Sequence, residues 1–317
     1  MIKKINLVEV HSDIAGQKKG ASLGIEALKE SCKDLDCEYF ETFLTETIKD
    51  ENEAHNQKSE FDHAKYIDKV FLVVSRLANT IKELRTKDIF PIVLAGDHAS
   101  CAGTMHGLKL AHPNDEIGVI YIDAHADIHS PYTSQSGNLH GMPLAIACAL
   151  DNMESAKNKP TNKEIEYWEK LKYLVSPQAS IKPENIVFCG LRDFEEAEKN
   201  LIDKYNISSH TVESITFEGI KNTVKNIFNK LSHCKHIYVS FDVDSVDPLY
   251  IPGTGTPVKN GLSYEQALQL NLELIKNDKV CCWEIAEINP IYNNSKDDSA
   301  KIFQILEKVT KNLIDNY

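Results

Sequence analysis

The 317-residue chain lacks three features that would assign it to other classes of protein. None of its eight cysteines stands in a Cys-x-x-Cys pair, so we expect reduced thiols that behave as small apolar side chains. No apolar run approaches the roughly 20 residues of a membrane span, and the N-terminal apolar stretch is too short for a signal peptide. Basic residues are too few for a nucleic-acid surface, since the formal net charge is −12. These absences predict a cytoplasmic protein that binds neither membrane nor nucleic acid.

The pattern of the sequence predicts an α/β fold. With 42% hydrophobic residues the chain can bury a large core, and strand signals alternate with helical ones, which is typical of a parallel sheet covered by helices. We expect strands at 2–8, 38–43, 91–95, 117–122, 185–189, 236–242 and 280–286. We expect amphipathic helices at 66–86, 264–277 and 299–315. The polar segment 151–183 is predicted to be a surface excursion with one helix, within a single domain spanning 1–317.

Four short stretches offer metal-binding side chains where predicted strands end. They are GDHAS at 96–100, DAHAD at 123–127, SFDVD at 240–244 and EINP at 287–290. Side chains alternate along an extended strand, so the three donors of DAHAD can point the same way. In parallel α/β sheets, ligands bind beyond the carboxyl ends of the strands. We therefore expect these four stretches to converge on one site.

The chemistry of these donors favours two metal ions. The set contains two imidazoles and four carboxylates: His98, His125, Asp123, Asp127, Asp242 and Asp244. Bringing the carboxylates together without a cation would raise several of their pKa values by mutual repulsion. An oxygen-rich, sulfur-free set suits Mn²⁺, and two adjacent ions can activate water as a nucleophile without any Ser or Cys.

Simpler interpretations exist for individual motifs. The pair Asp242 and Asp244 could open a calcium loop, but Val246 and Asp247 stand where that loop requires Asp or Asn and then Gly. The GDH stretch alone could be an ordinary turn after a strand. Gly16, Gly20 and Gly24 lack the Gly-Lys-Ser/Thr ending of a phosphate loop, so they predict turns or close packing.

The four motifs, in this order and spacing, resemble the ureohydrolase family, and within it the arginases. The likeness is most specific at 123–143, where DAHADIHSPYTSQSGNLHGMP joins the metal motif to a Ser-Gly-Asn-x-His loop. It continues at 242–266, DVDSVDPLYIPGTGTPVKNGLSYEQ, and at GLRD, 190–193. It extends over nearly the whole chain and implies a single three-layer arginase-like domain.

The resemblance implies a role for each candidate residue. One Mn²⁺ would be held by His98, Asp123, Asp127 and Asp242, and the other by Asp123, His125, Asp242 and Asp244, with Co²⁺ as a possible substitute. Asp127 would accept a proton, His140 would shuttle protons, and Glu287 would pair with the substrate guanidinium. We expect the pKa of His140 to lie near that of a free imidazole, because its loop is polar.

The remaining candidates would contact the other end of the substrate. The residues implied for this part of the site are His129, Ser134, Ser136, Asn138, Glu195, Glu198 and Thr256. Three residues depart from the family pattern: His129 replaces a usual Asn, Glu195 a usual Asp, and Ser245 a usual Gly. None of the three is a metal ligand, so they bear on substrate affinity.

The function implied is hydrolysis of L-arginine to L-ornithine and urea by a homo-oligomer, a trimer as is usual for the family. A related hydrolase acting on agmatine or a guanidino acid would keep every metal ligand and change only the head-group contacts. The Ser-Gly-Asn-x-His loop disfavours that alternative, and His129 is its best support. A non-catalytic relative would be expected to lose metal ligands, and a deacetylase-type site would need a single zinc.

Overall fold

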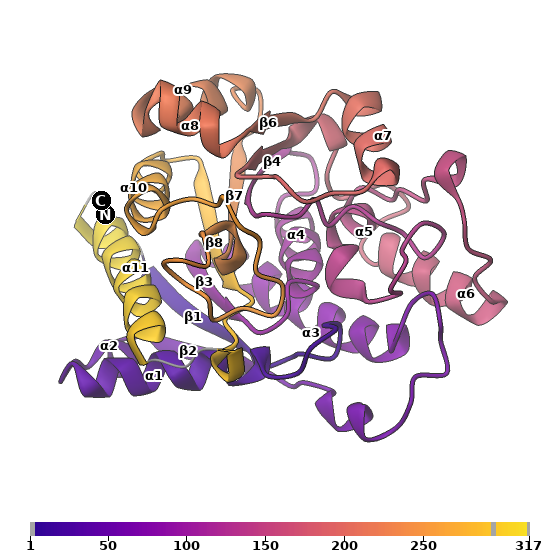
Figure 1. Cartoon of the computed structure of the whole chain (residues 1–317), viewed down its shortest axis with the longest axis horizontal. Coiled ribbons are helices and arrows are strands. Elements are labelled where there is room, and N and C mark those ends of the chain that lie inside the picture. Colours follow the sequence, from indigo (N-terminus) through magenta and orange to yellow (C-terminus); the bar gives the residue numbers. More distant parts are fainter. Residues whose placement is uncertain (1–3, 293–295, 316–317) are drawn as a thin grey trace.

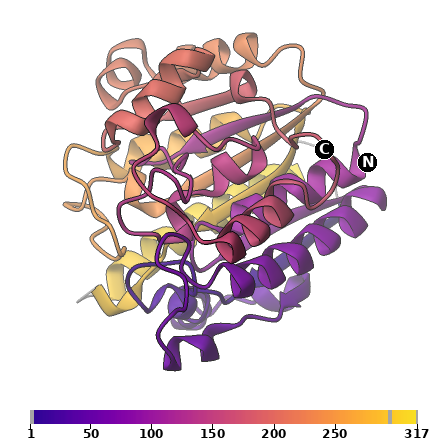
Figure 2. The same cartoon turned by 90° about the vertical axis from the view of Figure 1, so that its right-hand side faces the viewer.

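A computed structural model describes residues 4–292 and 296–315, and within them eight strands form one parallel sheet. The strand order is β2-β1-β3-β8-β7-β4-β5-β6, with helices on both faces (Figures 1 and 2). The strands are β1 (Lys4–Val10), β2 (Leu44–Ile48), β3 (Ile89–Ala95), β4 (Ile117–Ile122), β5 (Ile186–Cys189), β6 (Ser208–His210), β7 (His236–Asp242) and β8 (Val280–Ala286). The predicted three-layer α/β class is therefore confirmed.

The connections between strands are mostly helical, as a parallel sheet requires. The helices are α1 (Gly24–Asp34), α2 (Tyr39–Thr42), α3 (Ile67–Thr86), α4 (Ser100–Ala111), α5 (Pro143–Ala147), α6 (Asn162–Lys172), α7 (Glu196–Tyr205), α8 (Val212–Glu218), α9 (Ile220–Lys230), α10 (Tyr264–Leu274) and α11 (Lys296–Asp315). Within the described residues, no helix combines the length and apolar content needed to cross a membrane.

Successive side chains of each central strand belong to two separate hydrophobic cores, one on each face of the sheet. In β3, Ile92 and Leu94 pack with α1, α10 and α11, whereas Val93 packs with α3 and α4 on the opposite face. Because successive side chains of a strand point to opposite faces, a strand buried on both sides must be apolar throughout. This explains the continuous apolar runs of β3 and β4, in which nearly every side chain is buried.

The strand order places the four candidate motifs side by side. The sheet runs β3-β8-β7-β4 at its centre, so the chain segments that follow these strands meet at one edge. Ile122 pairs with Phe241, and Asp242 pairs with Ala286, so Asp123 and Asp242 leave neighbouring strands at the same level. Residues more than 100 positions apart in sequence thereby become neighbours.

Two strand predictions differ from the structure. The predicted strand 38–43 is instead the short helix α2, and the strand follows at Leu44–Ile48. Tyr39 packs edge-on against Phe303, with centroids 5.6 Å apart, and its hydroxyl lies 2.7 Å from Thr310 Oγ1. Contacts with α11 therefore override the local strand preference. Strand β6 was missed because Ser208–His210 is a short polar edge strand without apolar alternation.

The segment 151–183 lies at one end of the molecule and contains α6 (Figure 1). Trp168 and Leu171 of this helix are fully buried against the core. The Glu164 carboxylate accepts hydrogen bonds from the backbone N–H groups of His63 (2.7 Å) and Ala64 (3.2 Å). Through Glu164, this polar segment therefore also holds the backbone of the residues that precede α3.

Candidate active site

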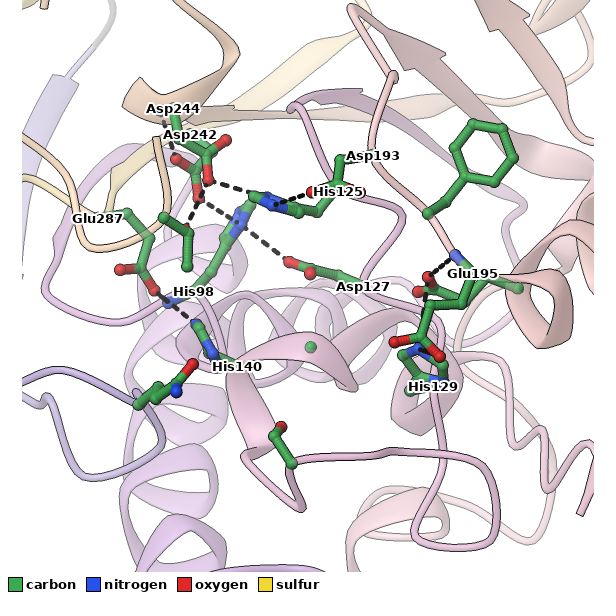
Figure 3. A pocket seen from close by; sticks show the side chains of 16 residues that line it. His98, His125, Asp127, His129, His140, Asp193, Glu195, Asp242, Asp244 and Glu287 are labelled. Carbon is green, nitrogen blue, oxygen red and sulfur yellow. Dashed lines mark hydrogen bonds and ion pairs between the residues drawn. The ribbon is translucent and has the colours of Figure 1, made fainter. Parts of the chain in front are cut away.

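His98 lies at the centre of a cluster of carboxylates. It follows β3 and is 1% exposed. Its Nδ1 atom lies 3.0 Å from Asp242 and 3.3 Å from Asp127 (Figure 3), and 2.9 Å from Asp123, in each case to the Oδ2 oxygen. Its Nε2 atom lies 2.7 Å from the Ser240 hydroxyl. When Nε2 donates to Ser240, the Nδ1 lone pair faces the carboxylates, which is the arrangement of a metal-binding imidazole.

The Asp-x-His and Asp-x-Asp spacings have a local structural cause. Asp123 Oδ1 accepts a hydrogen bond from the His125 backbone N–H at 2.7 Å, and Asp242 Oδ1 accepts one from the Asp244 N–H, also at 2.7 Å. An aspartate that bonds the backbone two residues further on forms a tight turn. Each turn immobilises one carboxylate oxygen and directs the other toward the cluster.

The donors fall into two overlapping groups. His98, Asp123 and Asp127 form one, and Asp123, His125 and Asp244 form the other, with the donor atoms of each group within 4.8 Å of one another. His125 Nδ1 lies 2.9 Å from Asp244 Oδ2. Asp123 belongs to both groups, so the geometry supports two adjacent ion positions that share a carboxylate.

One buried oxygen tests whether this cluster fits metal ions. Asp123 Oδ2 accepts no hydrogen bond from the described residues, although His98 Nδ1 lies 2.9 Å away. Burial and the charges of Asp244 and Asp127 raise the pKa of Asp123 to about 6. Burial and the neighbouring carboxylates also raise the pKa of Asp242 well above its usual range. Divalent cations among these oxygens would pair with the Asp123 oxygen and cancel the repulsion between the carboxylates. The donor set therefore fits metal ions.

A third group of donors consists of His112, Asp115 and His236. It lies at the amino ends of β4 and β7, whereas the candidate site lies at their carboxyl ends. The two imidazole rings are stacked, with centroids 3.6 Å apart and planes 17° apart. Each nitrogen lone pair lies in its ring plane, and because the two planes are nearly parallel and stacked, the lone pairs do not converge on one ion. Lys235 also lies 2.6 Å from the Asp115 carboxylate. This group is therefore a poor metal site.

A cavity of about 250 Å³ opens beside the cluster. Such a volume suits a ligand smaller than drug-sized molecules, whose pockets occupy about 300–1,000 Å³. Glu287 and His140 lie on one side of this cavity, with Glu287 Oε1 3.4 Å from His140 Nδ1 (Figure 3). Glu287 Oε1 also accepts a hydrogen bond from the His98 backbone N–H at 2.9 Å. These contacts hold a carboxylate and an imidazole next to the predicted metal ligands.

His140 departs from its predicted pKa. Burial acts to lower the value, but the hydrogen bond with Glu287 and its negative charge outweigh burial, so the pKa of His140 is raised. The prediction of a value near that of a free imidazole was wrong because the sequence did not reveal that Glu287 is a neighbour. The shift makes protonation of His140 more favourable than protonation of a free imidazole.

Acidic residues form the far wall of the cavity. Glu195 precedes α7, and Glu198 lies in its first turn and accepts the Glu195 backbone N–H at 3.0 Å. Burial is the main cause that raises the pKa of Glu198 to about 8. His129 Nε2 lies 3.4 Å from Glu198 and 3.7 Å from Glu195, and the Gln135 amide donates to Glu195 at 2.7 Å. The side chains of His129 and Gln135 therefore contact the carboxylates that form this wall.

The cavity walls include most of the predicted substrate contacts. Ser136, His129, Glu195, Glu198 and Thr256 line it, and the Thr256 hydroxyl donates to Asp244 Oδ2 at 3.0 Å. Ser134 and Asn138 are buried and do not line this cavity, and Ser134 Oγ accepts the Gly137 N–H at 3.0 Å. The Asn138 amide nitrogen has no hydrogen-bond partner among the described residues. Substrate contact by these two residues stays a prediction.

Several supporting residues were not singled out by sequence reasoning. The Arg192 guanidinium donates to the carbonyl oxygens of Asp244 and Val258, both at 2.8 Å, and so braces the loop after β7. The Tyr121 hydroxyl donates to Asp127 Oδ2 at 2.9 Å, and its ring stacks on His98. Arg192 could have been found through the GLRD motif, whereas Tyr121 lies inside an apolar strand that carries no such signal.

At the carboxyl ends of its parallel strands, the sheet carries a buried, carboxylate-rich donor set beside a small cavity. This arrangement is typical of metal-binding α/β hydrolytic enzymes. Comparison with known proteins narrows the class. The family model described as the arginase family matches residues 3–309. The chain belongs to the arginase family.

Individual relatives agree with this placement. The chain is 28% identical to the arginase of Bacillus subtilis, over 98% of each protein, and 30% identical to that of Brevibacillus brevis, over 92% of each. The structure is similar to the crystal structure of Entamoeba histolytica arginase in complex with L-ornithine, with a TM-score of 0.81, 27% identity and 99% of both chains covered.

Proposed function

We propose that this protein is an arginase that hydrolyses L-arginine to L-ornithine and urea. The observation that carries this proposal is the arrangement of the cavity. Glu287 lies beside the candidate metal donors at one side of the cavity, and Glu195 lies at the other side (Figure 3). Glu198 also lines the cavity and bonds the Glu195 backbone N–H. Carboxylates at both ends match a substrate with a guanidinium at one end and an ammonium at the other.

Two divalent ions are part of the proposal, with Mn²⁺ as the physiological ion and Co²⁺ as a possible substitute. His98, Asp123, Asp127 and Asp242 would hold one, and Asp123, His125, Asp242 and Asp244 the other. When bound, such ions lower the pKa of water and stabilise negative charge that develops on the substrate. The oxygen-rich donor set supports this choice of metal.

At the reacting end, the side chains of this chain position the substrate and move protons. Glu287 can receive the planar guanidinium through paired hydrogen bonds, which orients its carbon toward the metal donors. The Tyr121 hydroxyl holds Asp127 Oδ2, so Asp127 Oδ1 can accept the proton lost by the attacking water. His140, protonated more readily because of Glu287, can donate a proton to the departing amine.

Backbone strain supports the role of these carboxylates. Asp127 and Glu287 both adopt positive φ angles, 48° and 64°. Non-glycine residues in this region carry strain that surrounding contacts must hold, and such residues cluster at functional sites. The Glu287 backbone N–H donates to the Gly96 carbonyl at 2.8 Å, which keeps this conformation in place.

At the other end, polar groups would bond the amino-acid head of arginine. Glu195 and Glu198 would attract the α-ammonium, and Ser136 with its loop would bond the α-carboxylate. Agmatine has no carboxylate, so it would leave these groups unpaired. A site built to bond a group rejects analogues that lack it by up to about 10⁴-fold.

Product analysis tests the proposal. The metal-loaded protein is given arginine, agmatine and guanidinobutyrate, and urea with its co-product is measured for each. We expect kcat/KM for arginine to exceed that for agmatine by at least about 100-fold, since water can partly fill an open head-group site. Comparable rates for the two substrates would refute the arginase assignment and support the agmatinase or guanidino-acid alternative.

The trimeric assembly implied by the family resemblance and a cytoplasmic location stay predictions. Size-exclusion chromatography with light scattering would test the first, and fractionation of the source cells would test the second.

A further inference from the structure

Two of the eight cysteines contact each other, and neither of them lines the cavity beside the candidate metal donors. Cys32 lies in the last turns of α1, and Cys37 follows the end of that helix. Their sulfur atoms lie 2.7 Å apart, which approaches the S–S bond length of about 2.05 Å. Both are free thiols in the structure.

The local backbone explains why the two side chains meet. Asp36 adopts a left-handed conformation with φ 52°, and its N–H donates to the Lys33 carbonyl at 3.0 Å. The Cys37 N–H donates to the Cys32 carbonyl at 3.1 Å. These two bonds define a Schellman motif, in which the third-last helical residue and the second residue beyond the cap bring their side chains together. Here both of those positions are cysteine.

We propose that Cys32 and Cys37 form a dithiol site that closes to an intramolecular disulfide by exchange with a small-molecule disulfide. The inference does not depend on the catalytic assignment, because it concerns only the end of α1. The helix cap holds the two sulfur atoms together before any reaction, so ring closure requires little chain movement.

Burial assigns the order of events. Cys37 is half-buried, whereas Cys32 is 3% exposed, so Cys37 meets the reagent first. The Cys37 thiolate attacks one sulfur of the small disulfide, forms a mixed disulfide and releases one thiolate. The Cys32 thiolate then attacks Cys37 Sγ and releases the second. The two released thiolates take up the protons that the cysteines lost, so two protein thiols are oxidised and one small disulfide is reduced to two thiols.

The surroundings predict a slow reaction that accelerates with pH. Burial, the contact with Cys32 and the charges of Cys32 and Glu307 raise the pKa of Cys37 to about 11, although the Tyr39 backbone N–H acts in the opposite direction. Below that pKa, the thiolate fraction grows about tenfold for each pH unit. Closure should therefore be much faster at pH 9 than at pH 7.

The test exposes the full-length protein to oxidised glutathione, followed by acid quenching and a thiol count under denaturing conditions. We expect the count to fall from eight to six, with peptide mapping placing the new bond between Cys32 and Cys37. The closed form should melt about 3 °C higher, as a short covalent loop in a chain of this size predicts.

Three variants make the test specific. Cys234→Ser, at another buried cysteine, should still lose two thiols, from seven to five. Cys37→Ser should keep all seven. Cys32→Ser removes the second nucleophile, so it should accumulate the mixed disulfide of glutathione with Cys37. A count that stays at eight in the unmodified protein at pH 9, or a bond that maps to other cysteines, would overturn the proposal.

Discussion

The two ends of the catalytic cavity are built from different kinds of structure. At the predicted metal end, the candidate ligands lie at or just after the ends of β3, β4 and β7, and backbone N–H groups immobilise carboxylate oxygens of Asp123 and Asp242. At the head-group end, the wall consists of loops and the first turn of α7, and Glu195 Oε2 contacts the exposed Gln135 amide and the His129 ring. Backbone bonds at strand ends fix a site more rigidly than contacts between loop side chains. The metal end should therefore tolerate less change than the head-group end.

Exposure separates four of the six metal donors from Glu195, although the His125 side chain is 25% exposed and Glu198 only 5%. His98, Asp123, Asp242 and Asp244 are each 2% exposed or less, whereas the Glu195 side chain is 38% exposed. Interactions with exposed charges are weakened by water and salt. We therefore expect substitutions at the head-group end to alter affinity, and substitutions at the metal end to abolish catalysis.

The largest effect is expected for Asp242→Ala. This carboxylate lies 3.0 Å from His98 and is predicted to bridge both ions. Its loss should lower both metal content and activity, the latter by at least roughly 10³-fold, because the ions supply several kcal/mol of stabilisation in such enzymes. Metal analysis and kcat provide the measurement. Asp203→Ala, on the exposed face of α7, is the control and should leave both unchanged, whereas full activity in Asp242→Ala would refute the two-metal mechanism.

His140→Ala should separate catalysis from metal binding. The imidazole contacts Glu287 and is not one of the predicted ligands, so kcat should fall by about 10–10³-fold while metal content stays intact. His236→Ala is the matched control, because His236 lies at the amino end of β7 and the candidate site lies at the carboxyl end. Unchanged turnover in His140→Ala would show that this residue is only structural.

Arg192→Lys tests how far the metal end depends on its support. A lysine cannot reproduce the bonds that the guanidinium makes to the carbonyls of Asp244 and Val258. We expect metal affinity to fall by about tenfold, which is at the low end for residues that orient metal ligands. Titration of the metal-free protein with Mn²⁺ measures this effect. An unchanged affinity would mean that the loop after β7 is held without Arg192.

The smallest effect is expected for His129→Asn at the head-group end. His129 and Gln135 both approach Glu195 Oε2, so they compete with a substrate ammonium for that carboxylate. Removing the imidazole should lower KM for arginine by roughly 2–10-fold and leave kcat nearly unchanged, because the contact involves the unreacting end of the substrate. Gln135→Ala should act in the same direction. A large loss of kcat in either variant would contradict the division between the two ends.

The sequence by itself determined the parts of this protein that depend on local pattern. The apolar runs of β4, β7 and β8 predicted these strands correctly, because strands buried on both faces must be apolar throughout. The Asp-x-His and Asp-x-Asp spacings reflect turns that form within three residues, so the ligand motifs were visible without a fold. The Schellman geometry at Cys32 and Cys37 is equally local.

Only the tertiary structure decided features that depend on neighbours distant in sequence. The strand order brings β8 between β3 and β7, which places Glu287 beside His140 and raises the pKa of that histidine. Packing against α11 turned the predicted strand at 38–43 into α2. The contacts of His129 with Glu195 and Glu198 join the loop after β4 to the start of α7, about 70 residues away. Each outcome was decided by burial and charge contributed by another part of the chain, which no local pattern records.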